Sequence, residues 1–285
     1  MRITCLINGR TVKKSRACVS VFDNSLFYAE GLFETLLAIE GRAVYLEDHL
    51  DRLEKGAALI NLDIPCSRKR LRSWIKRAIK LNGQRIVKVR VTATAGDSAF
   101  WAGRKSRSRI IIIVTDYEIP TGSFRLGVSP FRVDQGSPFR NVKTLSFVIE
   151  MTSRKHAYSG RLDDHILLNR AGYVAEATSA NIFWIKGGRL FTTPLASGCL
   201  DGMTRKHVMK LAGELGIKAA KRNIRLNRLV MADEIFISSS LKLIMPVRSI
   251  RTDRVYRFPT GPITSELKAA LIDQIASPNI IGKRA

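Results

Sequence analysis

The chain of 285 residues is long enough for two average domains, because domains cluster near roughly 100 to 150 residues. Its hydrophobic fraction of 45% and charged fraction of 25% are those of a globular protein and argue against a disordered chain. The longest apolar run, residues 110–114, is far too short to span a bilayer, and the first residues carry no signal-peptide pattern, so we expect a cytoplasmic protein with no membrane partner.

Positive charge is the exceptional feature of the composition. Lys and Arg number 48 against 24 Asp and Glu, which gives a formal net charge of +24 at pH 7. This charge raises the alternative of a non-catalytic nucleic-acid-binding protein. The cations are spread along the chain, however, and in residues 68–80 apolar side chains recur at helical spacing, so the cations there should form the solvated face of an amphipathic helix. We therefore expect no specific nucleic-acid partner, only a weak, salt-sensitive attraction to polyanions.

The four cysteines, at positions 5, 18, 66 and 199, form no CxxC pair. They offer no basis for a zinc site or for dithiol redox chemistry, so we expect reduced thiols and no bound metal.

Strand-like and helix-like periods alternate along the first half of the chain. Strands are predicted for residues 1–8 and 32–39, which end in the turn sequences Asn8-Gly9 and Glu40-Gly41. Residues 87–95 alternate in polarity and predict a half-buried strand with Arg90 on its polar side. Residues 110–115 are apolar on both faces and should lie at the centre of a sheet.

Two helices are predicted between these strands. One begins at Leu46, in LEDHLDRLEKGAALINL, with acids in its first turn where the helix dipole favours them. The other covers the basic segment and ends at Asn82-Gly83. Mixed helices and strands in this order are typical of an α/β or α+β domain.

The second half repeats the alternation after a break. The sequence DYEIPTGSFR contains Pro120 and Gly122 and predicts a linker at 119–125, between an N-terminal domain at 1–118 and a larger C-terminal domain at 126–285. The C-terminal domain is expected to contain helices at 145–158 and 204–215 and strands at 165–169, 182–185, 189–192 and 234–238.

Three segments of the second half carry groups that could hold an anion or an acid–base centre. GYVAEATSANIF, residues 172–183, has the single acid Glu176 among small and apolar residues. LDGMTRKHV places Gly202 before a helix, where free backbone N–H groups could cradle a phosphate. A run of serines, residues 238–240, ends a predicted strand. Each pattern is common by itself, so their order along the chain matters more than any one of them.

In that order the chain resembles the class IV aminotransferases, the fold type IV enzymes that use pyridoxal 5′-phosphate (PLP). The resemblance rests on Lys143 in FRNVKTLSF, GYVAEATSANIF, TTPLASGCLDGMTR and ADEIFISSSLKLIMPV, and on VSVFDNSLFYAEGLFETL and LEDHLDRL in the first half. It covers nearly the whole chain. It implies an α/β (α+β) fold of two domains with the cofactor cleft between them, and a homodimer in which a partner loop completes that cleft.

The resemblance also implies roles for individual residues. Lys143 matches the lysine that forms a Schiff base with PLP, and an amine flanked by cations loses its proton more easily and becomes a nucleophile. Glu176 matches the acid that keeps the pyridinium nitrogen protonated. Arg52 matches the arginine on the cofactor phosphate, where a planar fork suits bidentate contact.

Further positions follow from the same motifs. The remaining implied cofactor-binding residues are Thr178, Asn181, Leu200, Gly202, Met203, Thr204, Ser239 and Ser240. The implied substrate-binding residues are Tyr28, Phe33 and Arg90. Arg90 is the expected partner of a substrate carboxylate.

The scaffold leaves two reactions open. The first is transfer of an amino group between an amino acid and a 2-oxo acid; the alternative is a 4-amino-4-deoxychorismate lyase of the folate branch, which expels pyruvate and leaves 4-aminobenzoate. Ala95-Gly96-Asp97 stands where D-amino-acid enzymes carry an Arg-x-His trap, and 146–148 lack the tyrosine of branched-chain enzymes. Leu200-Asp201-Gly202 and GSPFR look closer to the lyases. Because lyase and transaminase share most steps, sequence alone does not separate them.

Overall fold

The structure is a computed structural model that describes residues 2–97 and 108–276. The chain forms two compact units. The described part of unit 1 consists of residues 2–119 and 142–146, and that of unit 2 consists of 120–141 and 147–276. In neither unit is any described helix long and apolar enough to cross a membrane.

Unit 1 is built on a six-stranded antiparallel sheet with the order β2-β1-β6-β5-β3-β4. Its strands are β1 (Ile3–Ile7), β2 (Arg10–Val12), β3 (Gly31–Ile39), β4 (Arg42–Ala43), β5 (Ile86–Thr94) and β6 (Arg109–Asp116). The predicted strands and the central position of β6 are confirmed, and β5 alternates between half-buried and buried residues as its pattern requires. Both predicted turns have positive φ at two successive residues, which suits Asn-Gly and a turn glycine.

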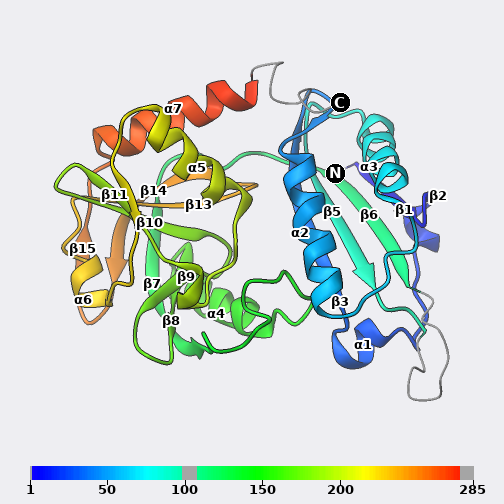
Figure 1. Ribbon diagram of the computed structural model, residues 1–285, viewed down its shortest axis with the longest axis horizontal. Helices are drawn as coiled ribbons and strands as arrows, with labels where there is room; N and C mark the ends of the chain where they lie inside the picture. Colours follow the sequence, from blue (N-terminus) through cyan, green and yellow to red (C-terminus); the bar gives the residue numbers. More distant parts are fainter. Residues whose placement is uncertain (1, 98–107, 277–285) are drawn as a thin grey trace. The chain divides into compact units, whose positions relative to one another are not determined.

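Two long helices cover this sheet (Figure 1), α2 (Leu46–Leu59) against β3 and α3 (Arg68–Asn82) against β1 and β6. Both helices are confirmed. Their buried residues, among them Leu50, Leu53, Leu71 and Ile75, form one core with the inner face of the sheet. The other helices in the described part of unit 1 are the short elements η1 (Lys14–Arg16) and α1 (Asn24–Tyr28).

The basic face of α3 is partly neutralised by the acids of α2. Arg68 lies 2.9 Å from Glu47, 2.6 Å from Asp51 and 2.7 Å from Glu54, and Arg72 lies 2.7 Å from Glu47. These arginines therefore tie two helices together at the surface. The interpretation of this segment as the solvated face of an amphipathic helix is confirmed, since its apolar residues are the buried ones.

Residues 142–146 join unit 1 although they follow the first part of unit 2 in the sequence. The Phe33 amide donates to the Lys143 carbonyl at 2.9 Å, the Leu145 amide donates to the Gly31 carbonyl at 2.9 Å, and Thr144 pairs antiparallel with Leu32. The segment thus extends along the end of β3. The predicted helix start at 145 is wrong for this reason: an extended residue cannot be helical, so α4 begins later, at Val148.

Unit 2 contains a nine-stranded mixed sheet with the order β12-β11-β10-β13-β14-β7-β8-β9, and β15 pairs with β14. Its strands are β7 (Phe124–Val133), β8 (Asp164–Asn169), β9 (Val174–Ala177), β10 (Asn181–Lys186), β11 (Arg189–Thr192), β12 (Ala219–Lys221), β13 (Glu234–Ser239), β14 (Leu243–Arg251) and β15 (Val255–Arg257). The four predicted strands are confirmed. The pairs β7–β8, β7–β14 and β11–β12 are parallel, which requires long connections between them.

The helices of unit 2 supply those connections and cover the sheet (Figure 1). They are α4 (Val148–Ser159), η3 (Leu195–Ser197), α5 (Met203–Glu214), α6 (Leu226–Leu229) and α7 (Pro262–Ala276). The helix predicted for 204–215 is confirmed as α5, with Val208, Leu211 and Ala212 buried. Mixed helices and sheets in both units confirm the predicted α/β (α+β) class.

Candidate functional site

In unit 1 two cationic side chains lie over one aromatic ring. The Lys143 Nζ atom is 4.3 Å from the centroid of Phe33, and the Arg90 guanidinium carbon is 3.8 Å from it. Phe33 is 6% exposed, and the pairing of its amide with the Lys143 carbonyl fixes the lysine at this place. A cation over a ring face is favoured by the ring quadrupole. Burial lowers the pKa of Arg90, whose Nε donates to Thr92 at 3.3 Å.

The side chain of Arg52 is held in place by the carboxylate of Glu34. Its Nε and Nη2 donate to the two carboxylate oxygens of Glu34, both at 2.7 Å, in a bidentate pair. His49 Nδ1 shares the second of these oxygens at 2.7 Å. Burial acts to raise the pKa of Glu34, but the charges of Arg52 and His49 outweigh it and lower that pKa to about 2. The pKa of His49 is lowered first by burial, and Arg52 and Lys143 lower it further against the opposing effect of Glu34.

Replacement of Glu34 by Gln is expected to destabilise unit 1 by about 3 kcal/mol, because the Arg52 guanidinium loses its counter-charge and the buried His49 ring loses a charged hydrogen-bond acceptor. Since the pKa of Glu34 is below its ordinary 4.5, its stabilising effect is complete above pH 4.5 and is lost as the pH falls towards 2. Urea denaturation at pH 7 and pH 3 measures both effects. Glu40→Gln, which breaks the exposed pair with Arg85, is the control and should change stability by less than about 0.5 kcal/mol. An equal effect of the two variants at pH 7 would contradict the role given to Glu34.

In unit 2 the carboxylate of Glu176 is 8% exposed and oriented by three donors. Arg140 Nη2 donates to Oε1 at 3.1 Å, while the Leu200 amide at 3.1 Å and Asn181 Nδ2 at 3.5 Å donate to Oε2. Arg140 also donates to Glu150 at 2.6 Å. The carboxylate is therefore mostly buried, and its position is fixed from both sides.

The same cluster leads to the start of α5. Asn181 Nδ2 donates to the Leu200 carbonyl at 2.8 Å, and a Cβ atom on Gly202 would lie 1.9 Å from Asn181 Oδ1, so only glycine fits there. Gly202 is the N-cap of α5 and provides no side-chain cap, and the first turn contains no acid. The amides of Met203 and Thr204, which precede the first intrahelical bond, are thus available at the positive end of the helix dipole.

The serines at the end of β13 lie next to this helix start. Ser238 is directly opposite Asn181 in the pairing of β13 with β10. Its Oγ atom is buried and has no hydrogen-bond partner among the described residues. Ser239 Oγ accepts the Lys242 amide at 3.2 Å, and Ser240 follows in the turn to β14. The structure therefore brings together the predicted residues Asn181, Glu176, Leu200 and Gly202 with the serine run.

Thr178 belongs to a different cluster. Its hydroxyl donates to Asp164, whose other oxygen accepts from Ser179 Oγ at 3.0 Å, and Ser179 Oγ in turn accepts from Lys242 Nζ at 2.6 Å. Asp164 is fully buried and Lys242 is 8% exposed. Burial lowers the pKa of Lys242 to about 8, with Asp164 opposing the shift and Arg154 adding to it. This network links the turn after β9 to the turn after β13.

The folded-state pKa of Lys242 predicts a pH-dependent stability. Between pH 8 and 10.5 the lysine is protonated in the unfolded chain but not in the folded one, so raising the pH favours the folded state. Relative to Lys242→Met, the wild type should therefore gain roughly 3 kcal/mol between pH 7.5 and 10.5, at 1.36 kcal/mol per pKa unit. Urea denaturation over this range gives the difference. Lys210→Met on the surface of α5 is the control, and a difference between wild type and Lys242→Met that ignores pH would refute the prediction.

Sequence reasoning missed several residues of these clusters. Glu34 and His49 lie inside motifs used above, and the spacing of His49 and Arg52 by three residues, which puts them on one helix face, was a usable signal. Arg140 precedes Lys143 by three residues, but no local pattern pairs it with Glu176. Tyr28 ends α1, where its side chain is 62% exposed.

Unit 1 thus holds a lysine fixed on an aromatic ring, and unit 2 holds a mostly buried carboxylate oriented from two sides near the start of a helix. Groups of each kind are common in enzyme sites. The family described as amino-transferase class IV matches residues 31–250 of the chain. This match covers more than half of the sequence, so the chain belongs to the class IV aminotransferases, a PLP-dependent family of enzymes.

Individual relatives match more than nine tenths of the chain. A Methanocaldococcus jannaschii protein named as a branched-chain-amino-acid aminotransferase is 30% identical over 94% of this chain and 94% of its own. The aminodeoxychorismate lyase of Bacillus subtilis is 26% identical over 92% and 91%. Among solved structures, the branched-chain aminotransferase of Thermoproteus uzoniensis with norvaline has a TM-score of 0.89 and 26% identity, covering 95% of this chain and 94% of that one.

Proposed function

We propose that this class IV aminotransferase binds PLP through Lys143 and transfers the amino group of a hydrophobic amino acid to a 2-oxo acid. The observation that carries the proposal is the placement of Lys143. Its backbone is paired to β3, its Nζ lies over the buried Phe33 ring, and it is close enough to the Arg52 cluster to shift the pKa of His49. The side chain of an ordinary solvated lysine would not be held over a buried ring in this way.

Each unit holds groups that suit a part of PLP. A phosphate requires several N–H or O–H donors, and unit 2 offers the start of α5 with no side-chain cap and the unpartnered Ser238 hydroxyl beside Ser239 and Ser240. Arg52 of unit 1 adds a guanidinium oriented by Glu34. A protonated ring nitrogen requires a carboxylate, for which Glu176 is buried and oriented.

When bound, PLP supplies an aldehyde that joins an amine covalently and a protonated ring that accepts electrons. Lys143 would hold the cofactor through Nζ and, once released, would remove the proton from the substrate Cα and deliver a proton on the way to product. Arg90 shares the Phe33 ring with Lys143, so a second cation lies close to the amine. Glu176 would keep the proton on the ring nitrogen, with Arg140 and the Leu200 amide holding its carboxylate in place.

The proposed substrate follows from Arg90 and from the relatives. A guanidinium on a ring suits a substrate carboxylate, and the place of Arg90 on the buried Phe33 ring keeps that guanidinium fixed. The archaeal relative and the Thermoproteus enzyme are both named for branched-chain amino acids.

A homodimer is part of the proposal. The exposed apolar residues around α1, namely Val21, Phe22, Leu26, Phe27 and Tyr28, give unit 1 a surface that a second copy would cover.

The reaction is tested by incubating the purified, PLP-saturated protein with L-leucine, L-valine or D-alanine and 2-oxoglutarate, and separately with 4-amino-4-deoxychorismate. We expect glutamate to form from the L-amino acids only when the keto acid is present. Release of pyruvate and 4-aminobenzoate without a keto acid would instead identify the lyase, which the Bacillus relative represents. Light scattering of the same sample measures whether the protein is a dimer.

A further inference from the structure

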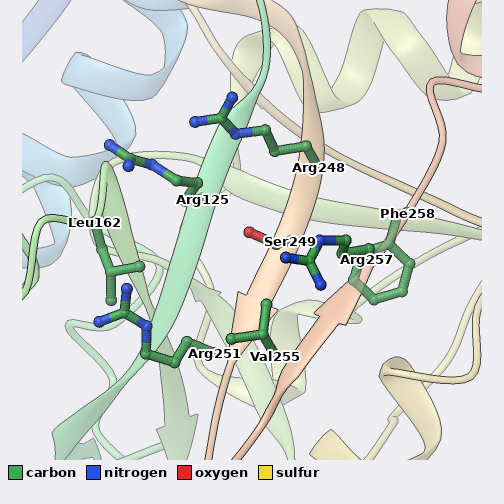
Figure 2. A pocket seen from close by; sticks show the side chains of 8 residues that line it. All are labelled: Arg125, Leu162, Arg248, Ser249, Arg251, Val255, Arg257 and Phe258. Atoms are coloured by element: carbon green, nitrogen blue, oxygen red, sulfur yellow. The ribbon is translucent and has the colours of Figure 1, made fainter.

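A pocket of unit 2 outside the groups described above is lined by arginines. Its volume is about 540 Å³, which is in the range of small-molecule sites. The lining residues are Arg125, Leu162, Arg248, Ser249, Arg251, Val255, Arg257 and Phe258 (Figure 2). Leu162 and Phe258 are 7% and 8% exposed and belong to the packed interior, whereas Val255, Arg248, Arg251 and Arg257 reach solvent.

The register of three neighbouring strands brings these side chains together. Ser249 on β14 is directly opposite Arg125 on β7 and Arg257 on β15. Residues opposite one another on adjacent strands have Cβ atoms roughly 5 Å apart on the same face of a sheet. Arg251 and Val255, two residues further along β14 and β15, lie on that face as well, because side chains alternate with a period of two.

Two local features open the pocket on this face. Ser249 is small and stands between the long Arg125 and Arg257 side chains, which leaves space above it (Figure 2). The pairing of β14 with β7 shifts register between Val247 and Ser249, so Arg248 is an extra residue in the ladder. A bulge re-aims the side chain of its extra residue, which explains how Arg248 lines the same pocket as its neighbour.

The charges on the pocket are far from balanced. The Asp163 carboxylate accepts hydrogen bonds from the amide of Arg125 at 2.7 Å and from the Nε and Nη2 atoms of Arg125, both at 3.2 Å. It also interacts electrostatically with Arg248. Arg251 Nη1 donates to the Gly160 carbonyl, a neutral acceptor, at 3.0 Å. Four guanidinium groups therefore line the pocket, and Asp163, which pairs with Arg125, is not itself among the lining residues. A sheet face that holds like charges so close together is stabilised by an anion.

We propose that this pocket binds a small molecule that carries two or more phosphate groups. Guanidinium groups bind phosphate oxygens in bidentate fashion and are always charged, and several of them on a rigid sheet suit a ligand with several anionic centres. The volume exceeds what one phosphate ion fills, and the apolar side chains of Leu162, Val255 and Phe258 offer contact to the uncharged part of the ligand. The site is independent of the proposed PLP chemistry, since none of its residues is among those assigned to the cofactor or substrate.

The test uses the full chain saturated with PLP, so that the cofactor phosphate groups are already occupied, and titrates sodium pyrophosphate by calorimetry at about 0.15 M ionic strength. The pocket variant is Arg248→Ser with Arg257→Ser. The matched control is Arg189→Ser with Arg222→Ser, which removes the same charge from exposed positions at β11 and β12, three or more strands from β14 in the sheet order. A third variant, Asp163→Asn, keeps an acceptor for Arg125 but removes the competing negative charge.

Saturable binding is expected in the wild type. The Kd should rise at least about tenfold in the pocket variant and less than about twofold in the control. In Asp163→Asn the Kd should fall several-fold, because the competing negative charge is gone. The opposite sign of the last variant excludes simple unfolding as the cause, and the melting temperature of each variant checks the fold. Equal weakening in pocket and control variants, or no saturable binding, would overturn the site in favour of a diffuse basic surface. Tighter competition by a single-stranded DNA 20-mer than by tripolyphosphate would assign the arginines to nucleic acid instead.

Discussion

Replacement of Lys143 by Ala is expected to lower kcat/KM for amino transfer by at least about 10³-fold, because the variant loses both the amine that joins the cofactor and the base that moves the Cα proton. The backbone pairing of residue 143 with Phe33 does not depend on the side chain, so the fold should be kept. Borohydride treatment followed by mass spectrometry should attach the cofactor to Lys143 in the wild type and to no residue in the variant.

Lys55→Ala, which removes an exposed ammonium from α2, is the control for this experiment and should keep both activity and the borohydride adduct. An active Lys143→Ala enzyme, or a borohydride adduct on another lysine, would contradict the assignment of Lys143 as the residue that binds the cofactor and moves the proton. Lys242 is the alternative amine to inspect, because its pKa is lowered to about 8 and its Nζ is bound to Ser179.

Replacement of Glu176 by Gln is the second variant with a large expected effect, a fall in kcat of about 10² to 10³-fold with a smaller change in KM. A neutral amide keeps an acceptor for the Leu200 amide but no longer stabilises a proton on the cofactor ring. The measured quantities are kcat and KM, together with the visible spectrum of the bound cofactor, which reports the protonation of the ring.

Glu150→Gln is a matched control because both acids bind the same guanidinium, that of Arg140. Glu150 makes the shorter contact, at 2.6 Å, so this control disturbs Arg140 without removing the acid assigned to the ring. If Glu150→Gln lowered kcat and changed the spectrum as much as Glu176→Gln, the role of Glu176 would lie in holding Arg140, and the assignment to the cofactor would be wrong.

Local pattern predicted the elements of this protein well, since periodicity and end signals are written in neighbouring residues. The helices α2, α3 and α5 and the central strand β6 were expected where they lie. Other elements were not predicted, among them β7, β14 and α7. The start of α4 was placed too early, because residues 143–145 pair with β3, more than 100 positions away in the chain, and a pairing partner at that distance leaves no local signal.

The amino-acid sequence by itself determined the class of the fold, the buried faces of its helices and strands, and the family motifs that contain Lys143 and Glu176. Tertiary structure alone decided which of these residues meet. Folding placed Arg90 and Lys143 over one phenylalanine ring and let Arg140 donate to Glu176. It also aligned Arg125, Ser249 and Arg257 in one row across three strands. The reason is physical: helix and strand periods depend on residues within a few positions, whereas strand register and ion pairing depend on groups brought close only by folding.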